Sequence, residues 1–104
     1  MKNGSAVEVV MDSAELTNPA GLHARPSVRL TGLAKSFGCA VEIALSPEGP
    51  WVDAKSPVKV MRVKASCGSV LHVRTTGAGA NAAAEAVMAL VREGFGEHGG
   101  DPHG

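Results

Sequence analysis

Short segments with a two-residue apolar repeat are interleaved with stretches that repeat their apolar residues every three to four positions. Residues 6–12, 39–45 and 69–76 alternate apolar and polar side chains, and residues 51–55 are predicted as a further short strand. Alternation of this kind predicts strands with one buried and one solvated face. Because such strands must bury their apolar faces against helices, the pattern predicts a layered α+β fold with one face of its sheet open.

Three helices are predicted among these strands, and two of them carry an apolar stripe at helical spacing. The stripes are Leu30, Leu33, Ala34 and Phe37 in the first helix and Ala84, Val87, Met88, Val91 and Phe95 in the last. We expect the first helix to end at Gly38, because glycine is common just past a helix C-terminus. A short helix should begin at Ser56-Pro57, a capping residue followed by proline. It would direct its apolar residues toward the core, namely Val60, Met61 and Val63.

The predicted order of elements is therefore β-α-β-β-α-β-α. This order corresponds to an open-faced β-sandwich, in which a four-stranded antiparallel sheet carries three helices on one face. In the first strand the apolar side is expected to consist of Val7, Val9 and Met11. The water-facing side of the sheet is expected to carry Glu8, Glu42 and His72.

The composition indicates a single domain and excludes several functions. The 104 residues suffice for one domain, predicted at residues 1–97, with a polar, glycine-rich tail at 98–104 that is expected to be disordered. Ten basic and ten acidic residues give a formal net charge of zero, and the aromatic residues are two Phe and one Trp. A nucleic-acid binder would need excess basic charge or stacking platforms, so we expect none.

No signal peptide and no apolar run of roughly 20 residues is evident. We therefore expect a cytoplasmic protein that does not insert into membranes. We also expect it to be a monomer. The two cysteines, Cys39 and Cys67, match no zinc spacing, and the tail residues His98, Asp101 and His103 would hold a metal only weakly. Neither a metal nor a cofactor is expected.

The stretch NPAGLHARPSVRL, residues 18–30, is the most informative for function. Proline is tolerated in the first turn of a helix, so Pro26 indicates a helix start and places His23 at or near the N-cap. Histidine is a poor cap, since Ser, Thr, Asp or Asn would satisfy the helix N–H groups better by about 1 kcal/mol. A local rule broken without a gain in stability is typical of a functional residue.

The helix start beside His23 favours an anion. The N–H groups of residues 24 and 25 point out of the helix end, and Arg25 adds a positive fork that fits phosphate oxygens. A phosphoryl group on the imidazole would bring about two negative charges to this position. Each charge-assisted hydrogen bond would contribute roughly 1.5–3 kcal/mol and the helix dipole roughly 0.3–2 kcal/mol. Such a balance steadies a phosphohistidine without trapping it, as a phosphoryl carrier requires.

The same stretch resembles the active-site signature of the HPr family, the histidine-containing phosphocarriers of the phosphoenolpyruvate-dependent sugar phosphotransferase system. The signature Gly-Leu-His-x-Arg-Pro is present at residues 21–26, and the resemblance extends over about residues 5–96. It implies that His23 accepts a phosphoryl group at Nδ1 from phospho-enzyme I, with phosphoenolpyruvate as the ultimate donor. The group would then pass to an EIIA-type domain for sugar uptake. Arg25 would stabilise the phosphate, supported by Gly21 and Pro26, and the carrier would have no independent turnover.

The resemblance extends to the predicted short helix, where Lys55-Ser56 matches a family pair whose serine is a regulatory phosphorylation site in some lineages. Pro57 and Lys59 depart from the family's usual residues nearby, so Ser56 is interpreted first as an ordinary N-cap. An exposed apolar patch with basic residues at its edge would suit partner docking. The residues predicted for this docking surface are Val58, Lys59 and Met61.

Four alternatives stay open at this point. The ending VREGFGE is similar to HPr-like domains of dihydroxyacetone kinase phosphotransfer systems, which would supply a different acceptor. A regulatory phosphocarrier without a transport role would retain the same residues. A small phosphohydrolase could use Arg25 to hold phosphate, and a pure interaction module could use the same surface without phosphoryl transfer.

Overall fold

The computed structural model of the chain describes residues 8–96, and its elements follow the predicted order. The strands are β1 (Val9–Glu15), β2 (Ala40–Ala44), β3 (Val52–Asp53) and β4 (Val70–Thr76). The helices are α1 (Ala24–Lys35), α2 (Pro57–Val63) and α3 (Ala80–Arg92), followed by the 3-10 turn η1 (Gly94–Gly96).

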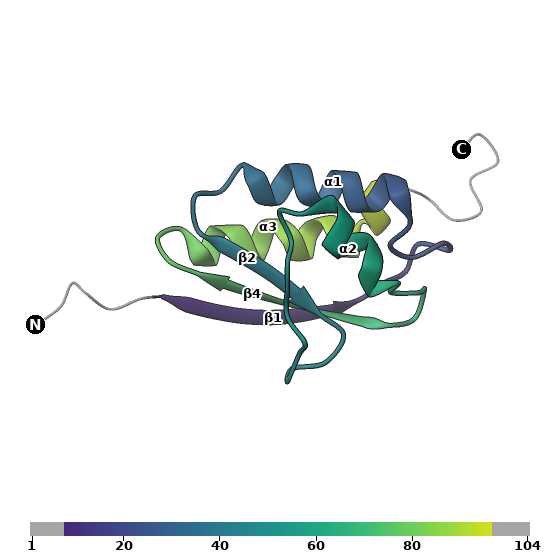
Figure 1. Cartoon of the computed structure of the whole chain (residues 1–104), viewed down its shortest axis with the longest axis horizontal. Coiled ribbons are helices and arrows are strands. Elements are labelled where there is room, and N and C mark those ends of the chain that lie inside the picture. The colour runs from purple at the N-terminus through teal and green to yellow at the C-terminus, as the bar shows by residue number, and fades with distance from the viewer. Residues whose placement is uncertain (1–7, 97–104) are drawn as a thin grey trace, which may run out of the picture.

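The strands form one antiparallel sheet in the order β1-β4-β2-β3. All three α-helices lie on the same face of this sheet, which confirms the predicted open-faced sandwich (Figure 1). The N-terminal end of α1 lies beside the C-terminal end of α3, where η1 contacts α1 (Figure 1). Segments that are distant in the sequence therefore meet where the candidate histidine is located.

The core lies between the inner face of the sheet and the helices, and it contains the predicted apolar stripes. Its buried members include Val41, Ile43, Leu71 and Val73 of the sheet, Leu30 and Ala34 of α1, and Val87, Met88 and Val91 of α3. Burial of each larger side chain contributes roughly 1.5–3 kcal/mol. These contacts hold α1 against the sheet and so position its N-terminal end.

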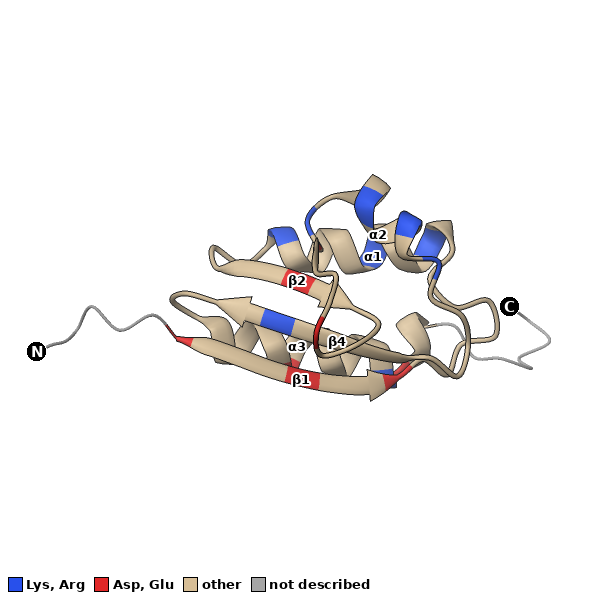
Figure 2. Cartoon of the chain, turned by 60° about the horizontal axis from the view of Figure 1, so that its bottom comes forward, with Lys and Arg blue, Asp and Glu red and all other residues tan. Residues whose placement is uncertain are grey.

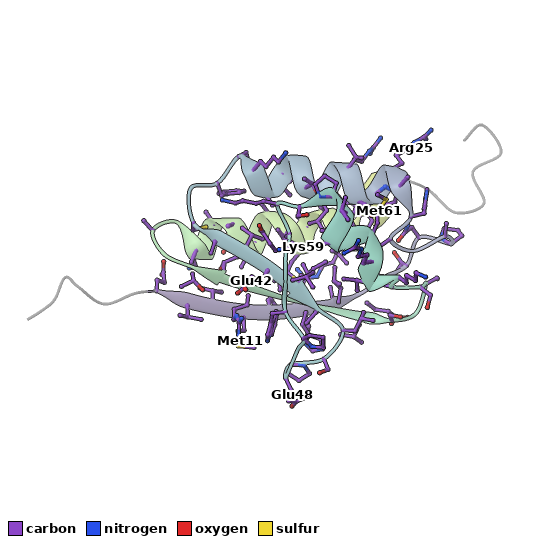
Figure 3. The ribbon with its side chains drawn as sticks, in the orientation of Figure 1. Met11, Arg25, Glu42, Glu48, Lys59 and Met61 are labelled. Atoms are coloured by element: carbon purple, nitrogen blue, oxygen red, sulfur yellow. The ribbon has the colours of Figure 1, made fainter. Side chains whose placement is uncertain are left out.

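The first strand differs from its prediction in both range and face. β1 covers Val9–Glu15, whereas residues 6–12 were expected, of which 6 and 7 lie outside the described residues. Val10 and Ala14 pack against the core, while Val9 and Met11 are 55% and 52% exposed, and Met11 points away from the helices (Figure 3). The predicted face of β1 is wrong because three successive apolar residues, 9 to 11, do not define which side is buried.

The open face of the sheet carries Glu42 and His72, as predicted. An Arg74 Nη2 atom lies 2.9 Å from Glu42 Oε1, and the Arg74 guanidinium lies 4.4 Å from the centroid of the Trp51 ring. Glu8 precedes β1 and is exposed. This face is therefore a mixed polar surface that needs no second layer.

Two helices end earlier than predicted. α1 ends at Lys35 with Ser36 as its C-cap, and Gly38 does not adopt a left-handed conformation. The Ser36 hydroxyl donates a 2.6 Å hydrogen bond to the Leu33 carbonyl. This bond pairs one of the carbonyl groups at the C-terminal end of the helix, so no glycine is needed there. α3 ends at Arg92, and Phe95 reaches the core from η1 instead of from the helix.

The short helix α2 confirms its predicted start but not all of its predicted core residues. Val60 is buried and Val63 is packed against the core, whereas Met61 is 39% exposed. The prediction that Met61 faces the core is wrong, since successive residues of a helix are about 100° apart and only one face of α2 is covered.

The predicted tail at 98–104, with His98, Asp101 and His103, lies outside the described residues, as does the start of the predicted domain 1–97. Those boundaries stay predictions.

Candidate functional site

His23 is the N-cap residue of α1, the position that the sequence predicts. Its backbone is extended, with φ −83° and ψ −166°, and its side chain makes no capping hydrogen bond. The His23 carbonyl accepts the first helical bond from Ser27 N at 3.0 Å. His23 itself is exposed, so its imidazole is accessible to a partner.

Pro26 is the third residue of α1 and is buried. It has no N–H group, so the donors of the first turn that face outward belong to Ala24 and Arg25. The helix dipole adds partial positive charge at this end. The positive potential of this helix end, carried by the N–H groups of Ala24 and Arg25, therefore directly follows His23 in the chain.

Gly21 allows the loop before His23 to lie directly against the backbone of residues 65 and 66. Its φ is +66°, in the left-handed region. A Cβ atom here would lie 2.8 Å from Ser66 Cα and would also collide with the Ala65 carbonyl oxygen. Only glycine fits both the conformation and the space, so the predicted role of Gly21 in shaping this loop has a structural basis.

Hydrogen bonds fix the loop before His23 on two sides. The Asn18 Nδ2 group donates to the Gly21 carbonyl at 2.7 Å, and Asn18 is buried. Leu22 N donates to the Ala65 carbonyl at 2.9 Å, which ties the loop to the segment after α2. The buried position of Asn18 follows from the tertiary fold.

His23 and Arg25 line one shallow depression that is open to solvent, together with Ala24, Val28 and Arg29. Arg25 projects from the first turn of α1 (Figure 3). Sequence reasoning missed Arg29, although its position one helical turn after Arg25 could have indicated a shared face. The depression thus has a histidine, two guanidinium groups and an exposed valine.

Basic and acidic side chains are separated on the molecule despite the net charge of zero. Segments 16–41 and 54–84, which include α1 and α2, contain no Asp or Glu. Most Lys and Arg residues gather on these two helices and their flanks, while the acidic residues lie mainly on the sheet side (Figure 2). The surface around His23 is therefore suited to an acidic partner or an anion.

The predicted docking residues lie on α2, which packs beside α1. Val58 is 53% exposed, and Lys59 and Met61 are also exposed (Figure 3). Ser56 is the N-cap of α2, and its Oγ atom accepts a hydrogen bond from Lys59 N at 3.3 Å. The interpretation of Ser56 as a cap is confirmed.

In residues 8–96 no group of three or more His, Cys, Asp or Glu side chains could hold a metal ion. Over the same range no helix is long and apolar enough to cross a bilayer.

The fold and the site define a class of protein, a small α+β domain that presents an exposed histidine at the positive end of a helix beside arginine. A family model described as "PTS HPr component phosphorylation site" matches residues 10–93. The chain belongs to the HPr family of phosphocarriers of the phosphotransferase system.

Individual relatives agree with this family. The chain is 40% identical to the phosphocarrier protein HPr of Cupriavidus necator over 79% of this chain and 90% of that protein. It is 33% identical to the phosphocarrier protein NPr of Escherichia coli over 85% of this chain and 97% of that protein. A crystal structure of HPr-C-His from Thermoanaerobacter tengcongensis superposes with a TM-score of 0.78 at 28% identity, covering 86% of this chain and 98% of that one.

Proposed function

We propose that the chain accepts a phosphoryl group on His23 from phospho-enzyme I and passes it to an EIIA-type domain for sugar uptake in the cytoplasm. The observation that carries this proposal is the exposed His23 at the N-cap of α1, with Arg25 in the first turn of that helix. Phosphoenolpyruvate would be the ultimate donor. The protein would work as a monomer and as an intermediate without its own turnover.

The transfer itself is a nucleophilic displacement at phosphorus. The Nδ1 lone pair of neutral His23 forms a P–N bond while the bond between phosphorus and the donor breaks, and its electron pair stays on the donor. The ring proton is lost from His23 as the donor group takes one up. Passage to the acceptor is the same step with His23 as the leaving group, so the carrier returns unchanged.

The positive end of α1 supports the phosphorylated state. The N–H groups of Ala24 and Arg25, together with the Arg25 guanidinium, lie in the first turn of α1, directly after His23. Charge-assisted hydrogen bonds contribute roughly 1.5–3 kcal/mol each. Because the site is exposed, water and salt screen these contacts, so they hold the phosphoryl group without preventing its transfer.

Partner recognition would use the docking surface formed by Val58, Lys59 and Met61. Exposed apolar side chains next to a basic rim match the composition of transient interfaces. The separation of charge predicts that donor and acceptor present acidic surfaces to α1 and α2. Ser56 stays a candidate regulatory phosphorylation site, subordinate to its role as a cap.

A second candidate function is a carrier of the same chemistry with a different acceptor. The curated relatives carry two names, HPr and NPr, at similar identity, so a regulatory carrier outside sugar uptake competes with the first proposal. A dihydroxyacetone kinase phosphotransfer system is a further acceptor of this kind. The acceptor, not the chemistry at His23, distinguishes these candidates.

A relay experiment tests the proposal. The chain is labelled with isotopic phosphoenolpyruvate and enzyme I, separated, and mixed with an EIIA-type domain or with a dihydroxyacetone kinase phosphotransfer subunit. We expect label to move to the EIIA-type domain, and about tenfold to a hundredfold slower labelling of Arg25→Ala. If label moves only to the kinase subunit, that subunit replaces the EIIA-type domain as the proposed acceptor. If label never enters the chain, the proposal is overturned.

A further inference from the structure

Arg29 lies one helical turn beyond Arg25 and is held by the other end of the chain. Its Nη1 atom donates a 2.6 Å hydrogen bond to the carbonyl of Phe95 in η1. Side chains on a helix lean toward its N-terminus, so the Arg29 guanidinium extends toward the end of α1 that begins at His23. Arg29 also lines the depression that contains His23 and Arg25.

The turn that supplies this carbonyl is fixed in an uncommon conformation. Gly94, Phe95 and Gly96 all have positive φ, at +65°, +59° and +77°. A left-handed phenylalanine is costly, and here the cost is offset by full burial of its ring in the core. A Cβ atom at Gly96 would collide with the Arg29 guanidinium. The Arg29 guanidinium therefore packs directly against the backbone of this turn.

The Phe95 carbonyl uses one of the five N–H donors of Arg29. In the described part of the chain no carboxylate neutralises Arg29, since the ion pair found there joins Arg74 to Glu42. A neutral carbonyl holds the guanidinium in place but leaves its full positive charge at the depression. A carboxylate partner would have cancelled that charge.

We propose that Arg29 is a second phosphoryl-binding cation, held by the Phe95 carbonyl, that contacts the phosphoryl group on His23 together with Arg25. The inference rests on the proposed function only in that a phosphoryl group reaches His23. It assigns a role to η1, which places the guanidinium. Two arginines one helical turn apart would then share the charge of the phosphoryl group.

A measurement on the phosphorylated chain tests this inference without enzyme I. Phosphoramidate phosphorylates imidazoles directly: its P–N bond breaks, a P–N bond forms on the ring, and ammonia leaves and takes up the ring proton as ammonium. Phosphorus NMR then gives the pH midpoint of the second ionisation of the phosphoryl group. The signal of His23 is the one that His23→Ala lacks.

We compare Arg29→Gln, Arg29→Lys and the control Lys35→Gln, which removes a positive charge from the far end of the same helix. A nearby cation favours the dianion, so Arg29→Gln should raise the midpoint by roughly 0.3 units or more, after screening by solvent. Arg29→Lys should restore part of the shift. Lys35→Gln should match the parent chain, because about 18 Å of helix separates residue 35 from His23.

An unchanged midpoint in Arg29→Gln overturns the inference, even if its thermal unfolding midpoint falls, since a purely structural role would alter only stability. Absence of a His23 signal in the parent chain would also overturn it. If Arg29→Gln does not fold, Arg29→Met, which keeps an apolar stem but removes the charge, is compared with Lys35→Gln and decides in the same way. A chain that phosphoramidate labels but phospho-enzyme I does not would end the proposed function and leave this inference measurable.

Discussion

At the scale of single residues, the site depends on positions where an ordinary choice would have been more stable. His23 takes an N-cap that Ser or Asp would satisfy better, and its side chain makes no capping bond. Gly21 adopts a left-handed conformation against the backbone of residues 65 and 66. His23 is the candidate phosphoryl acceptor, and the left-handed conformation of Gly21 lets the loop bring this histidine to the helix end.

The constraint on Gly21 leads to a prediction about stability. Gly21→Ala should lower the free energy of unfolding by about 2 kcal/mol or more, because alanine is strained at this φ and its Cβ would collide with the neighbouring backbone. Gly32→Ala is the matched control, since Gly32 lies in α1, is exposed and has open space around it. It should raise stability by about 0.5–1 kcal/mol. Urea denaturation measures both, and equal stability of the two variants would contradict the account.

At the scale of elements, buried apolar side chains position the helices, and capping hydrogen bonds stabilise their ends. α1 is held by Leu30 and Ala34 in the core, and α3 by Val87 and Val91. α2 has only seven residues, and isolated helices of that length are unstable in water. Its conformation therefore depends on tertiary contact and on its N-cap, Ser56.

The cap of α2 gives the prediction at this scale. Ser56→Ala should cost about 1 kcal/mol of unfolding free energy, because Lys59 N loses its acceptor. Ser56→Asp should keep the stability of the parent chain, because aspartate is an equally good cap and complements the helix dipole. Denaturant titration with circular dichroism checks the pair, and a Ser56→Ala variant as stable as Ser56→Asp would remove the capping role.

At the scale of the whole molecule, the arrangement of charge matters more than its sum. A chain with equal numbers of acidic and basic residues presents a basic helical surface and an acidic sheet side (Figure 2). Such separation steers partners to one face and makes association sensitive to salt. The composition led us to expect no nucleic-acid partner, but it did not reveal this asymmetry.

Salt dependence tests the steering. Raising ionic strength from about 0.05 M to about 0.5 M should slow transfer from phospho-enzyme I. The added salt shortens the Debye length and so screens the attraction between the two proteins as they approach. Lys59→Gln should slow transfer at low salt by about two- to fivefold and weaken the salt dependence. Lys35→Gln is the control of equal charge outside the docking surface. Stopped-flow or quench-flow rates decide, and identical salt slopes for the two variants would refute steering through Lys59.

The sequence was sufficient for the fold class, the element order and the position of His23, because each rests on a local pattern. It failed where a local pattern has more than one solution, as at the apolar run of β1, where Val9 and Met11 were assigned to the wrong face. It also could not reveal the contact of Arg29 with Phe95, which joins residues 66 positions apart. Contacts of that range are created by the packing of α1 against the end of α3.

The central claim is that His23 is the phosphoryl acceptor, and intact mass tests it most directly. The chain is incubated with enzyme I and phosphoenolpyruvate, and its mass is recorded before and after mild acid, alongside His23→Ala with its folding verified. We expect the parent chain to gain one phosphoryl group that acid removes, and the folded variant to gain none. An acid-stable gain, or an equal gain in His23→Ala, would contradict the account.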